Sequence, residues 1–316
     1  GRVPLKARLF GHVRVLNRIG TIAPGMANLV NGMKPVRWLM GKALGLAKER
    51  RIPEFAPSLK RQWGTPSARA GPTVVLFGDC FTMYNEPGIG LAAKEVLEAF
   101  GYRVELVDAG CCGRAMISTG LLADAIAAAD LAIGKLQRCI DDTSVAAVVV
   151  CEPSCLSAIK DDWLQLKLRS PMAVRRKLAA KSWLVEEFLE RGWESHPKKP
   201  VIRGGTDVLL HGHCHQKSLW GADSSAALLK RLLGDRVKVP DTGCCGMAGS
   251  FGYTQDHYDV SMRIGELTLF PAVRGRGGAE VLAPGTSCRH QIMDGTGVRA
   301  LHPIEFVAEL LRGAAE

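Results

Sequence analysis

Two pairs of adjacent cysteines, each enclosed by glycines, constrain this chain more than any other feature. One pair lies in DAGCCGRAMISTG, residues 108–120, and the other lies in DTGCCGMAGSFGY, residues 241–253. Neighbouring Cα atoms are about 3.8 Å apart, below the range of roughly 4.4–6.8 Å that disulfides favour. Each pair therefore presents two thiols that do not bond comfortably to one another.

Both pairs belong to an internal repeat, which appears when residue numbers are subtracted. Four cysteines are matched at offsets of 133 or 134 residues: Cys80 with Cys214, Cys111 with Cys244, Cys112 with Cys245, and Cys155 with Cys288. The flanking residues agree as well, because TVVLFGDC (73–80) corresponds to DVLLHGHC (207–214). Such self-similarity predicts two copies of one unit of about 130 residues.

The hydrophobic pattern predicts the same architecture in both copies. Apolar runs typical of strands occupy 73–78, 103–107 and 145–150, and again 207–211, 236–240 and 279–283. Helical patterns separate them (90–101, 121–140, 224–234 and 257–274), and a helix closes each copy at 181–192 and 302–313. We therefore expect an α/β fold with parallel strands, in which two tandem units are related by a pseudo-two-fold axis. The expected boundaries are 1–70 for a basic helical segment, 71–199 for the first unit and 200–316 for the second.

Charge is concentrated in the N-terminal segment. Residues 1–70 carry fourteen Lys and Arg against two acidic residues, whereas the remainder of the chain has a net charge of −2. A nucleic-acid-binding domain would carry its positive charge on the folded body, so this class is excluded. The segment could contact an acidic partner domain or an anionic membrane surface, or its charges could simply be solvated. Its helical pattern is broken by Pro24, Pro35, Pro53 and Pro57. The missing initiator Met suggests a piece of a longer protein.

Ten cysteines in a chain without a secretory signal indicate thiolate chemistry in a reducing compartment. The four matched positions fall at or just after strand ends, where open α/β sheets bind ligands. Four thiolates brought together there could bind a tetrahedral zinc ion or an iron–sulfur cluster. Adjacent thiolates can point to different metal atoms of one cluster, which favours the cluster. Cys139 and Cys151 have no counterpart in the other copy, and we expect them to be structural.

Two repeats of C-x(about 30)-CCG-x(about 40)-C resemble the cysteine-rich CCG domain of iron–sulfur oxidoreductases. That domain occurs in heterodisulfide reductase, in the iron–sulfur subunits of glycolate oxidase and anaerobic glycerol-3-phosphate dehydrogenase, and in lactate-utilisation proteins. The phrases EPSCL (152–156), HGHCHQKSL (211–219) and GTSCRHQI (285–292) are similar to the C-terminal region of FAD-linked D-2-hydroxyglutarate and D-lactate dehydrogenases.

The resemblance implies an oxidoreductase component that passes electrons from a flavin to an acceptor. By this resemblance Cys80, Cys111, Cys112 and Cys155 would bind a first iron–sulfur centre, of [4Fe–4S] type. Cys214, Cys244, Cys245 and Cys288 would bind a second. FAD is expected on a partner or a missing N-terminal domain, together with a ferredoxin-like module, and the acceptor would be a quinone or a soluble carrier. The expected location is cytoplasmic, with the basic segment available for contact with the inner membrane face.

The chain departs from heterodisulfide reductase at two positions. That enzyme has a fifth cysteine in each motif, whereas Ala158 and Gln291 occupy these places here. A five-thiolate cluster and disulfide reduction are therefore not expected, although a thiol or disulfide reductase and a zinc-stabilised docking module remain the alternatives. No residue is assigned as catalytic.

Two further patterns are open to interpretation. His211, His213 and His215 alternate around Cys214 in the second copy only, where they could bind or support a metal centre or simply be polar loop residues. Gly88, Gly90 and Ala93 imitate a dinucleotide fingerprint with Asp108 downstream. The preceding strand ends too early for the tight turn that this motif requires, so we expect no cofactor-binding residues there.

Overall fold

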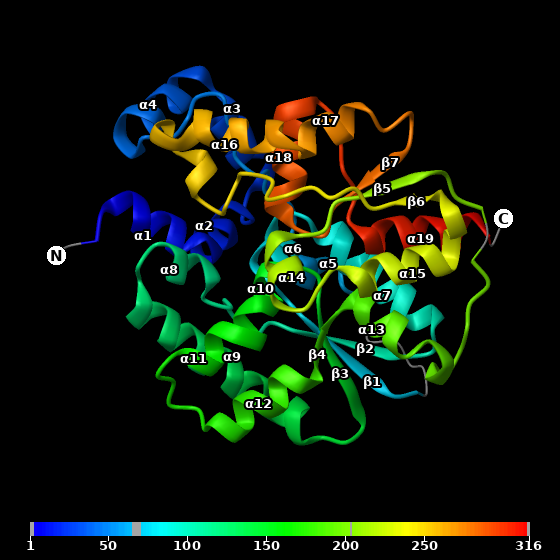
Figure 1. Cartoon of the computed structure of the whole chain (residues 1–316). Coiled ribbons are helices and arrows are strands. Elements are labelled where there is room, and N and C mark those ends of the chain that lie inside the picture. Colours follow the sequence, from blue (N-terminus) through cyan, green and yellow to red (C-terminus); the bar gives the residue numbers. More distant parts are fainter. Residues whose placement is uncertain (1–2, 65–70, 203, 315–316) are drawn as a thin grey trace.

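Two parallel β-sheets form the framework of the molecule (Figure 1), whose structure is a computed structural model that describes residues 3–64, 71–202 and 204–314. The first sheet has the strand order β2-β1-β3-β4 and the second β6-β5-β7. The strands are β1 (Thr73–Phe77), β2 (Arg103–Val107), β3 (Val145–Val150), β4 (Ser182–Leu184), β5 (Val208–Leu210), β6 (Val237–Lys238) and β7 (Glu280–Leu282). All pairings within these sheets are parallel, so the expected α/β class is confirmed.

The two sheets have corresponding strand orders, as two copies of one unit would. The first strand of each half lies in the middle, with the second strand on one side and the third on the other. The correspondence extends further. Leu301 forms a parallel bridge to Leu282 of β7 and so lies in the place that corresponds to β4, which pairs with β3 in the first sheet. The repeat and its boundaries at 70 and 199 nevertheless stay predictions.

Two predicted helices differ from the structure. Residues 181–192 were expected to form one helix, but Ser182–Leu184 pair with β3 and only α13 (Val185–Arg191) is helical. Three residues are too few to show a strand periodicity in the sequence, so the following helical pattern dominates there. The predicted helix at 257–274 is divided into α16 (Gln255–Leu267) and α17 (Leu269–Arg274), because the backbone of Thr268 leaves the helical region at φ −147°.

A shared layer of helices lies between the two sheets (Figure 1). It consists of α7 (Pro87–Ala99), α13, α15 (Asp223–Leu233) and α19 (Pro303–Gly313). Alternate strand residues such as Val74 and Leu76 of β1 face this layer together with Val208 and Leu210 of β5. Their neighbours Val75 and Phe77 face the opposite side, as the two-residue period of a strand requires.

The outer faces of the sheets are covered by the remaining helices. Those on the first sheet are α8 (Arg114–Ser118), α9 (Leu122–Asp141), α10 (Pro153–Ser157), a π-helical turn (Ala158–Asp162), α11 (Trp163–Gln165) and α12 (Met172–Lys181). The second sheet is covered by α17 and α18 (Thr286–Thr296). Short helices α6 (Cys80–Tyr84) and α14 (Cys214–Leu219) follow the central strands β1 and β5.

The N-terminal segment wraps across both halves. It forms α1 (Leu5–Gly11), α2 (Val13–Gly20), α3 (Pro24–Gly32), α4 (Lys34–Leu44) and α5 (Leu59–Gln62), while positions 1–2 and 65–70 of the expected segment lie outside the described residues. Helices α1 and α2 pack on α8 and α6 of the first half. Arg50, which is 1% exposed, donates to Gly252 O at 2.7 Å and pairs with Asp294 at 2.9 Å in the second half. The segment therefore ties the two halves together.

A buried ion pair joins the halves at their centre. Arg289 of α18, whose side chain is 6% exposed, lies 2.7 Å from Glu86, which precedes α7. Burial raises the pKa of Glu86, but the Arg289 guanidinium opposes this and holds the pKa at about 2. Thr286 strengthens the seam, because its hydroxyl donates to Glu86 at 2.8 Å and its N–H donates to Glu152 at 2.9 Å.

We expect Arg289→Gln to lower the free energy of unfolding by up to about 3 kcal/mol, because it leaves the Glu86 carboxylate, which is 24% exposed, without its charged partner. Arg274→Gln is the matched control, since Arg274 and its partner Glu266 are each about half exposed, and loss of an exposed pair costs roughly 0–1 kcal/mol. Urea unfolding followed by fluorescence measures both.

The same comparison has a defined pH dependence. The pKa of Glu86 is lowered from 4.5 to about 2. The ion pair with Arg289 therefore stabilises the fold fully above a pH of about 4.5, and this contribution is lost as the pH falls towards 2. Equal losses for Arg289→Gln and Arg274→Gln at pH 7 would contradict the role of this seam.

Candidate iron–sulfur sites

Each set of four matched cysteines gathers at one end of a sheet. Cys80 begins α6 directly after β1, Cys111 and Cys112 follow β2, and Cys155 lies in α10 after β3. Their counterparts follow the corresponding strands of the second sheet, with Cys214 at the start of α14 and Cys288 in the first turn of α18. Parallel strands end at the same edge of a sheet, so residues distant in sequence meet there. All ten cysteines of the chain are free.

The thiols of the first site contact one another in two pairs. Cys80 Sγ lies 3.7 Å from Cys111 Sγ, and Cys112 Sγ lies 3.0 Å from Cys155 Sγ. Hydrogen bonds from the neighbouring thiols of Cys112 and Cys80 lower the pKa of Cys111 to about 3. The same contacts, together with burial, raise the pKa of Cys80 and Cys112. The site thus stabilises negative charge on sulfur in a buried place.

The second site repeats this pattern. Cys214 and Cys245 hydrogen-bond to Cys244 and lower its pKa to about 2, while Cys245 also contacts Cys288. Cys214 and Cys244 are partly exposed, whereas every cysteine of the first site is buried. The second site therefore lies nearer to solvent.

Glycines after the cysteine pairs bring backbone N–H groups to the sulfur atoms. Gly113 N donates to Cys111 Sγ at 3.4 Å, and Gly246 N donates to Cys244 Sγ at 3.3 Å. Both glycines have positive φ, at 84° and 90°. A Cβ at Gly246 would stand 2.2 Å from Ser261 O, so the residue is required for both its conformation and its size.

Charged and polar groups outside the repeat motif complete the two sites differently. Arg14 of α2 approaches Cys80 Sγ to 3.7 Å and donates to Gly78 O at 3.0 Å. It also forms an ion pair with Asp108. The second site instead has His211, whose Nδ1 lies 2.6 Å from Thr242 Oγ1. No local pattern in the sequence indicates the role of Arg14, because its contacts are 64–94 residues away.

The strand ends before His211 and His213, which were expected to belong to it, whereas His215 lies beyond the strand as expected. β5 ends at Leu210, so His211, His213 and His215 lie in the following loop and helix. His213 is buried and its Nδ1 accepts from His215 N at 3.2 Å, while His215 Nδ1 lies 3.0 Å from Ser157 Oγ across the seam. Burial lowers the pKa of His215 to about 4. His215 therefore contributes to packing between the halves.

The unmatched cysteines and the glycine fingerprint have structural surroundings. Cys139 and Cys151 lie in the hydrophobic cores on opposite faces of the first sheet. Gly90 lies within α7, where a Cβ would stand 2.4 Å from Leu59 and 2.9 Å from Thr82. The fingerprint residues Gly88 and Ala93 lie in the same helix, so the pattern reflects packing and does not form a strand-to-helix turn.

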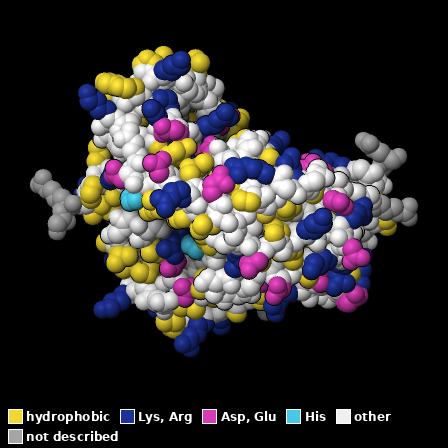
Figure 2. All heavy atoms as spheres, turned by 45° about the horizontal axis from the view of Figure 1, so that its top comes forward, with side chains coloured by type: hydrophobic (Ala, Val, Ile, Leu, Met, Phe, Trp, Pro, Cys, Tyr) yellow, Lys and Arg dark blue, Asp and Glu magenta, His cyan; other side chains and the backbone are white. Residues whose placement is uncertain are grey.

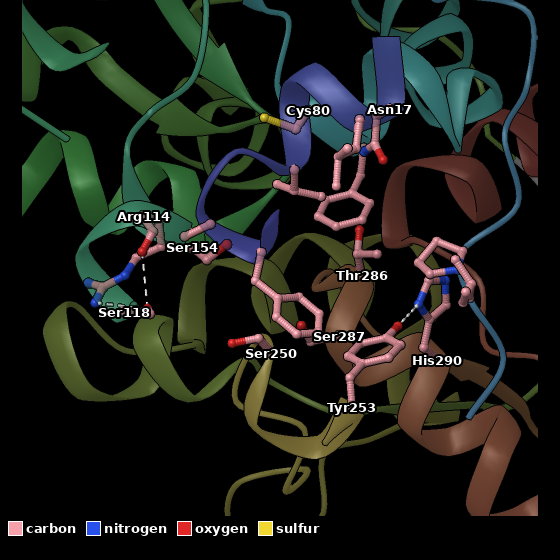
Figure 3. Close-up of a pocket in the computed structure, with 18 of the residues that line it drawn as sticks. Asn17, Cys80, Arg114, Ser118, Ser154, Ser250, Tyr253, Thr286, Ser287 and His290 are labelled. Carbon is pink, nitrogen blue, oxygen red and sulfur yellow. Dashed lines mark hydrogen bonds between the residues drawn. The ribbon is translucent and has the colours of Figure 1, made fainter. Parts of the chain in front are cut away.

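A cavity of about 570 Å³ connects the two sites. Six of the eight matched cysteines line it: Cys80, Cys111, Cys112, Cys155, Cys214 and Cys245. Figure 3 shows Cys80 on one side of this space, with Tyr253 and His290 on another, Thr286 and Ser287 between them, and Ser154 near Arg114 on the facing side. The two sites thus face a common interior space, beneath the N-terminal helices.

The donor set fits an iron–sulfur cluster. A cluster spreads its thiolates over several metal atoms, so adjacent thiolates such as those of Cys111 and Cys112 can each bind a different one. His211 Nε2 is buried and has no hydrogen-bond partner among the described residues. A hydrogen bond from Cys245, helped by the nearby His211 and His213 rings, holds the pKa of Cys288 well below its usual range. An imidazole beside a thiolate is an arrangement that supports a sulfur-bound cluster.

Comparison with known proteins agrees with this donor set. Residues 74–160 match the family described as "Cysteine-rich domain", CCG. Residues 74–160 therefore resemble a CCG domain. The expected resemblance is thereby confirmed, and the matched residues include Cys80, Cys111, Cys112 and Cys155.

The curated relatives include a dehydrogenase subunit, a dehydrogenase and a lactate utilization protein. The chain is 27% identical to a subunit of the anaerobic glycerol-3-phosphate dehydrogenase of Escherichia coli, over 98% of the chain and 78% of that protein. It is also 27% identical to D-2-hydroxyglutarate dehydrogenase of Escherichia coli, of which the match covers 31%. Lactate utilization protein A of Bacillus cytotoxicus is 26% identical over 56% of the chain and 73% of that protein. The chain therefore spans about a third of one relative and most of the others.

We expect Gly246→Ala to lower the thermal unfolding midpoint and to reduce iron binding at the second site. The added Cβ meets the Ser261 carbonyl and the residue has φ +90°, so the loop carrying Cys244 and Cys245 must shift. Gly249→Ala is the control, because Gly249 also has positive φ but its Cβ would meet nothing within 4 Å. Strain from φ alone costs roughly 1 kcal/mol. Equal effects of the two variants on iron content would show that the close approach at Gly246 is unimportant.

Proposed function

We propose that the chain is the iron–sulfur electron-transfer component of a dehydrogenase. The observation that carries this proposal is the pair of four-thiol sites that face one interior cavity. A bound iron–sulfur cluster supplies reversible one-electron transfer. Two such sites in one chain would give a route between a partner that releases electrons and an acceptor that receives them.

The residues around the thiolates have defined roles in this proposal. Cys80, Cys111, Cys112 and Cys155 hold one centre, and the four counterparts hold the other. Gly113 and Gly246 direct their N–H groups at sulfur, and the Arg14 cation lies beside Cys80. Donors and positive charge near the sulfur atoms favour added electrons and raise the reduction potential.

We propose a [4Fe–4S] cluster held by four thiolates at each site. The places of a fifth cysteine are occupied by Ala158, which is buried at the start of the π-helical turn, and by Gln291. The Gln291 amide donates to Ser261 O at 3.0 Å, so its side chain is used for packing against α16. A zinc-stabilised docking module and a thiol or disulfide reductase are the competing functions that metal analysis distinguishes.

Substrate oxidation would take place on a flavin-bearing partner. Glycerol-3-phosphate, D-2-hydroxyglutarate and lactate, named in the relatives, each carry a secondary alcohol. A 2-hydroxy acid of the D-2-hydroxyglutarate, D-lactate or glycolate type is our proposal for this chain's complex. A ferredoxin-like module would carry electrons from the FAD to the cysteine sites, and a quinone or a soluble carrier would accept them.

We expect the anaerobically purified protein to contain iron and sulfide rather than zinc. Cys112→Ser and Cys245→Ser should each remove about half of the iron, because each breaks one of two four-thiolate sites. Cys139→Ser and Cys151→Ser are the controls, since both residues lie in hydrophobic cores. Iron, sulfide and zinc are measured for each variant. Zinc without sulfide, or iron loss in Cys151→Ser as large as in Cys155→Ser, would overturn the assignment.

Peripheral membrane association through the N-terminal segment also belongs to this proposal. None of the helices within residues 3–64, 71–202 and 204–314 has the length and apolar character to span a bilayer. We define the amphipathic lobe as residues 22–42, which form α3 and α4 with the turn before them. Six of its apolar side chains are between 47% and 77% exposed: Ile22, Met26, Leu29, Met33, Trp38 and Leu39.

Basic residues accompany these apolar side chains. Lys34, Arg37 and Lys42 belong to α4, and Lys42 Nζ lies 4.9 Å from the centre of the Trp38 ring. Figure 2 shows hydrophobic, Lys and Arg side chains together on the projecting upper part of the molecule. Exposed apolar and basic side chains on one helical surface are typical of binding to the interface of an anionic bilayer.

We expect the protein to sediment with anionic phosphatidylglycerol vesicles and to be released by high salt. Leu39→Ser should weaken this binding about tenfold or more, since burial of one Leu side chain contributes about 1.5–3 kcal/mol. Leu131→Ser in α9 is the matched control, because Leu131 is 57% exposed and Leu39 is 58% exposed. Equal binding of the two variants would exclude the lobe as the contact surface.

A further inference from the structure

Many apolar side chains line the interior cavity besides the cysteines. Helices α1, α2 and α4 cover it with side chains that include Phe10, Val13, Leu16, Ile19, Met40 and Leu44. The cysteines that line the cavity belong to other elements, at or after the ends of the strands. Most small-molecule sites are concave, largely apolar and provided with a few polar groups, and this cavity has the same composition.

Polar groups line the cavity on the side of the second half. Tyr253 Oη lies 3.2 Å from His290 Nδ1, and Figure 3 shows this pair beside the hydroxyl groups of Thr286 and Ser287. Ser154 lies on the facing side. These hydroxyl and imidazole groups can donate hydrogen bonds to the carbonyl oxygens of a ligand.

The cavity opens towards the helices that carry the exposed apolar surface. Leu16 and Ile19 line the cavity and are also 40% and 59% exposed. These two residues therefore mark a mouth on the outer side of α2, just before the amphipathic lobe. A ligand that leaves a membrane would meet apolar side chains along this whole path.

We propose that the cavity binds a quinone, with its ring at the polar and cysteine-lined end and its tail along α1, α2 and α4. This inference rests on the proposed function and selects the lipid-soluble acceptor over a soluble carrier. An apolar wall stabilises an alkyl tail by about 0.8 kcal/mol for each buried methylene, whereas a charged carrier would lose its hydration there.

The redox step balances with the two sites. The quinone takes up two electrons and two protons and becomes a quinol. Cys80, Cys111, Cys112 and Cys155 and their four counterparts would hold two iron–sulfur centres, which would supply one electron each and regain it from the partner dehydrogenase. The protons come from water that reaches the polar end of the cavity.

Direct binding of decylubiquinone to the purified, iron-containing protein tests the proposal. We expect saturable quenching of tryptophan fluorescence with one quinone per chain. Affinity should rise by about fourfold for each methylene when analogues with shorter alkyl tails are compared. Absence of saturable binding, or an affinity independent of tail length, would overturn the site.

A matched pair of substitutions locates the bound tail. Val13 lines the cavity, so Val13→Trp places a larger ring in that space. Val15→Trp places the same ring on the exposed side of α2, where Val15 is 54% exposed. Val13→Trp should weaken binding by about tenfold or more through loss of several buried methylenes, and Val15→Trp should leave it unchanged. Because added tryptophans alter quenching, equilibrium dialysis measures the affinities. Equal affinities of the two variants would refute the location.

A second pair keeps the test decisive if Val13→Trp does not fold. Ala115 of α8 lines the opposite part of the cavity, and Ala123 of α9 is exposed. Ala115→Phe should weaken quinone binding and Ala123→Phe should not. Competition by a low-molecular-weight disulfide at the same site would instead assign the cavity to a thiol or disulfide reductase.

Iron analysis separates failure of this inference from failure of the proposed function. A protein with full iron and sulfide content that does not bind decylubiquinone contradicts only the quinone site. If it binds quinone but contains zinc, the iron–sulfur proposal is wrong and the proposed redox step fails with it. After reduction by dithionite, Val13→Trp should reduce decylubiquinone more slowly than Val15→Trp does, while both reduce ferricyanide at equal rates.

Discussion

The ion pair between Glu86 and Arg289 fixes how the two halves face one another. Glu86 lies directly before α7 and Arg289 lies one residue after Cys288, so the pair connects the first half with a cysteine-bearing turn of the second. Thr286 and Glu152 continue the connection, and Glu152 lies three residues before Cys155. A buried pair of this kind has strict geometric requirements. The same interactions that join the halves therefore also orient both thiol sites towards the common cavity.

The thiol sites illustrate how a small number of backbone constraints determine a chemical arrangement. A strand delivers Cys80 or Cys214 to the edge of its sheet, and positive φ at Gly113 or Gly246 turns the chain after each cysteine pair. The N–H of each glycine is then directed back to sulfur. Negative charge on sulfur is consequently stabilised by groups that the fold already holds in place.

Much of this arrangement could be predicted from the sequence, because its signals are periodic or local. The offset of 133 residues identified the matched cysteines, and hydrophobic runs located the strands. The missed strand Ser182–Leu184 is too short to produce a periodic pattern. The Glu86–Arg289 contact spans 203 residues and the contact of Arg14 with Cys80 spans 66. Neither contact leaves a local sequence signal, so neither the seam nor the charge beside the first site could be predicted.

The N-terminal segment makes two similar sites different. It contributes Arg14 beside Cys80, which is buried, while Cys214 and Cys244 remain partly exposed. A nearby cation stabilises additional negative charge, and the effect is larger where water is excluded. The first site consequently has a cation beside a buried thiol, and the second has the better access to solvent. The same segment closes the cavity over both sites, so one addition to the repeated fold sets the electrostatic difference between the sites and also shapes the entrance to the space they share.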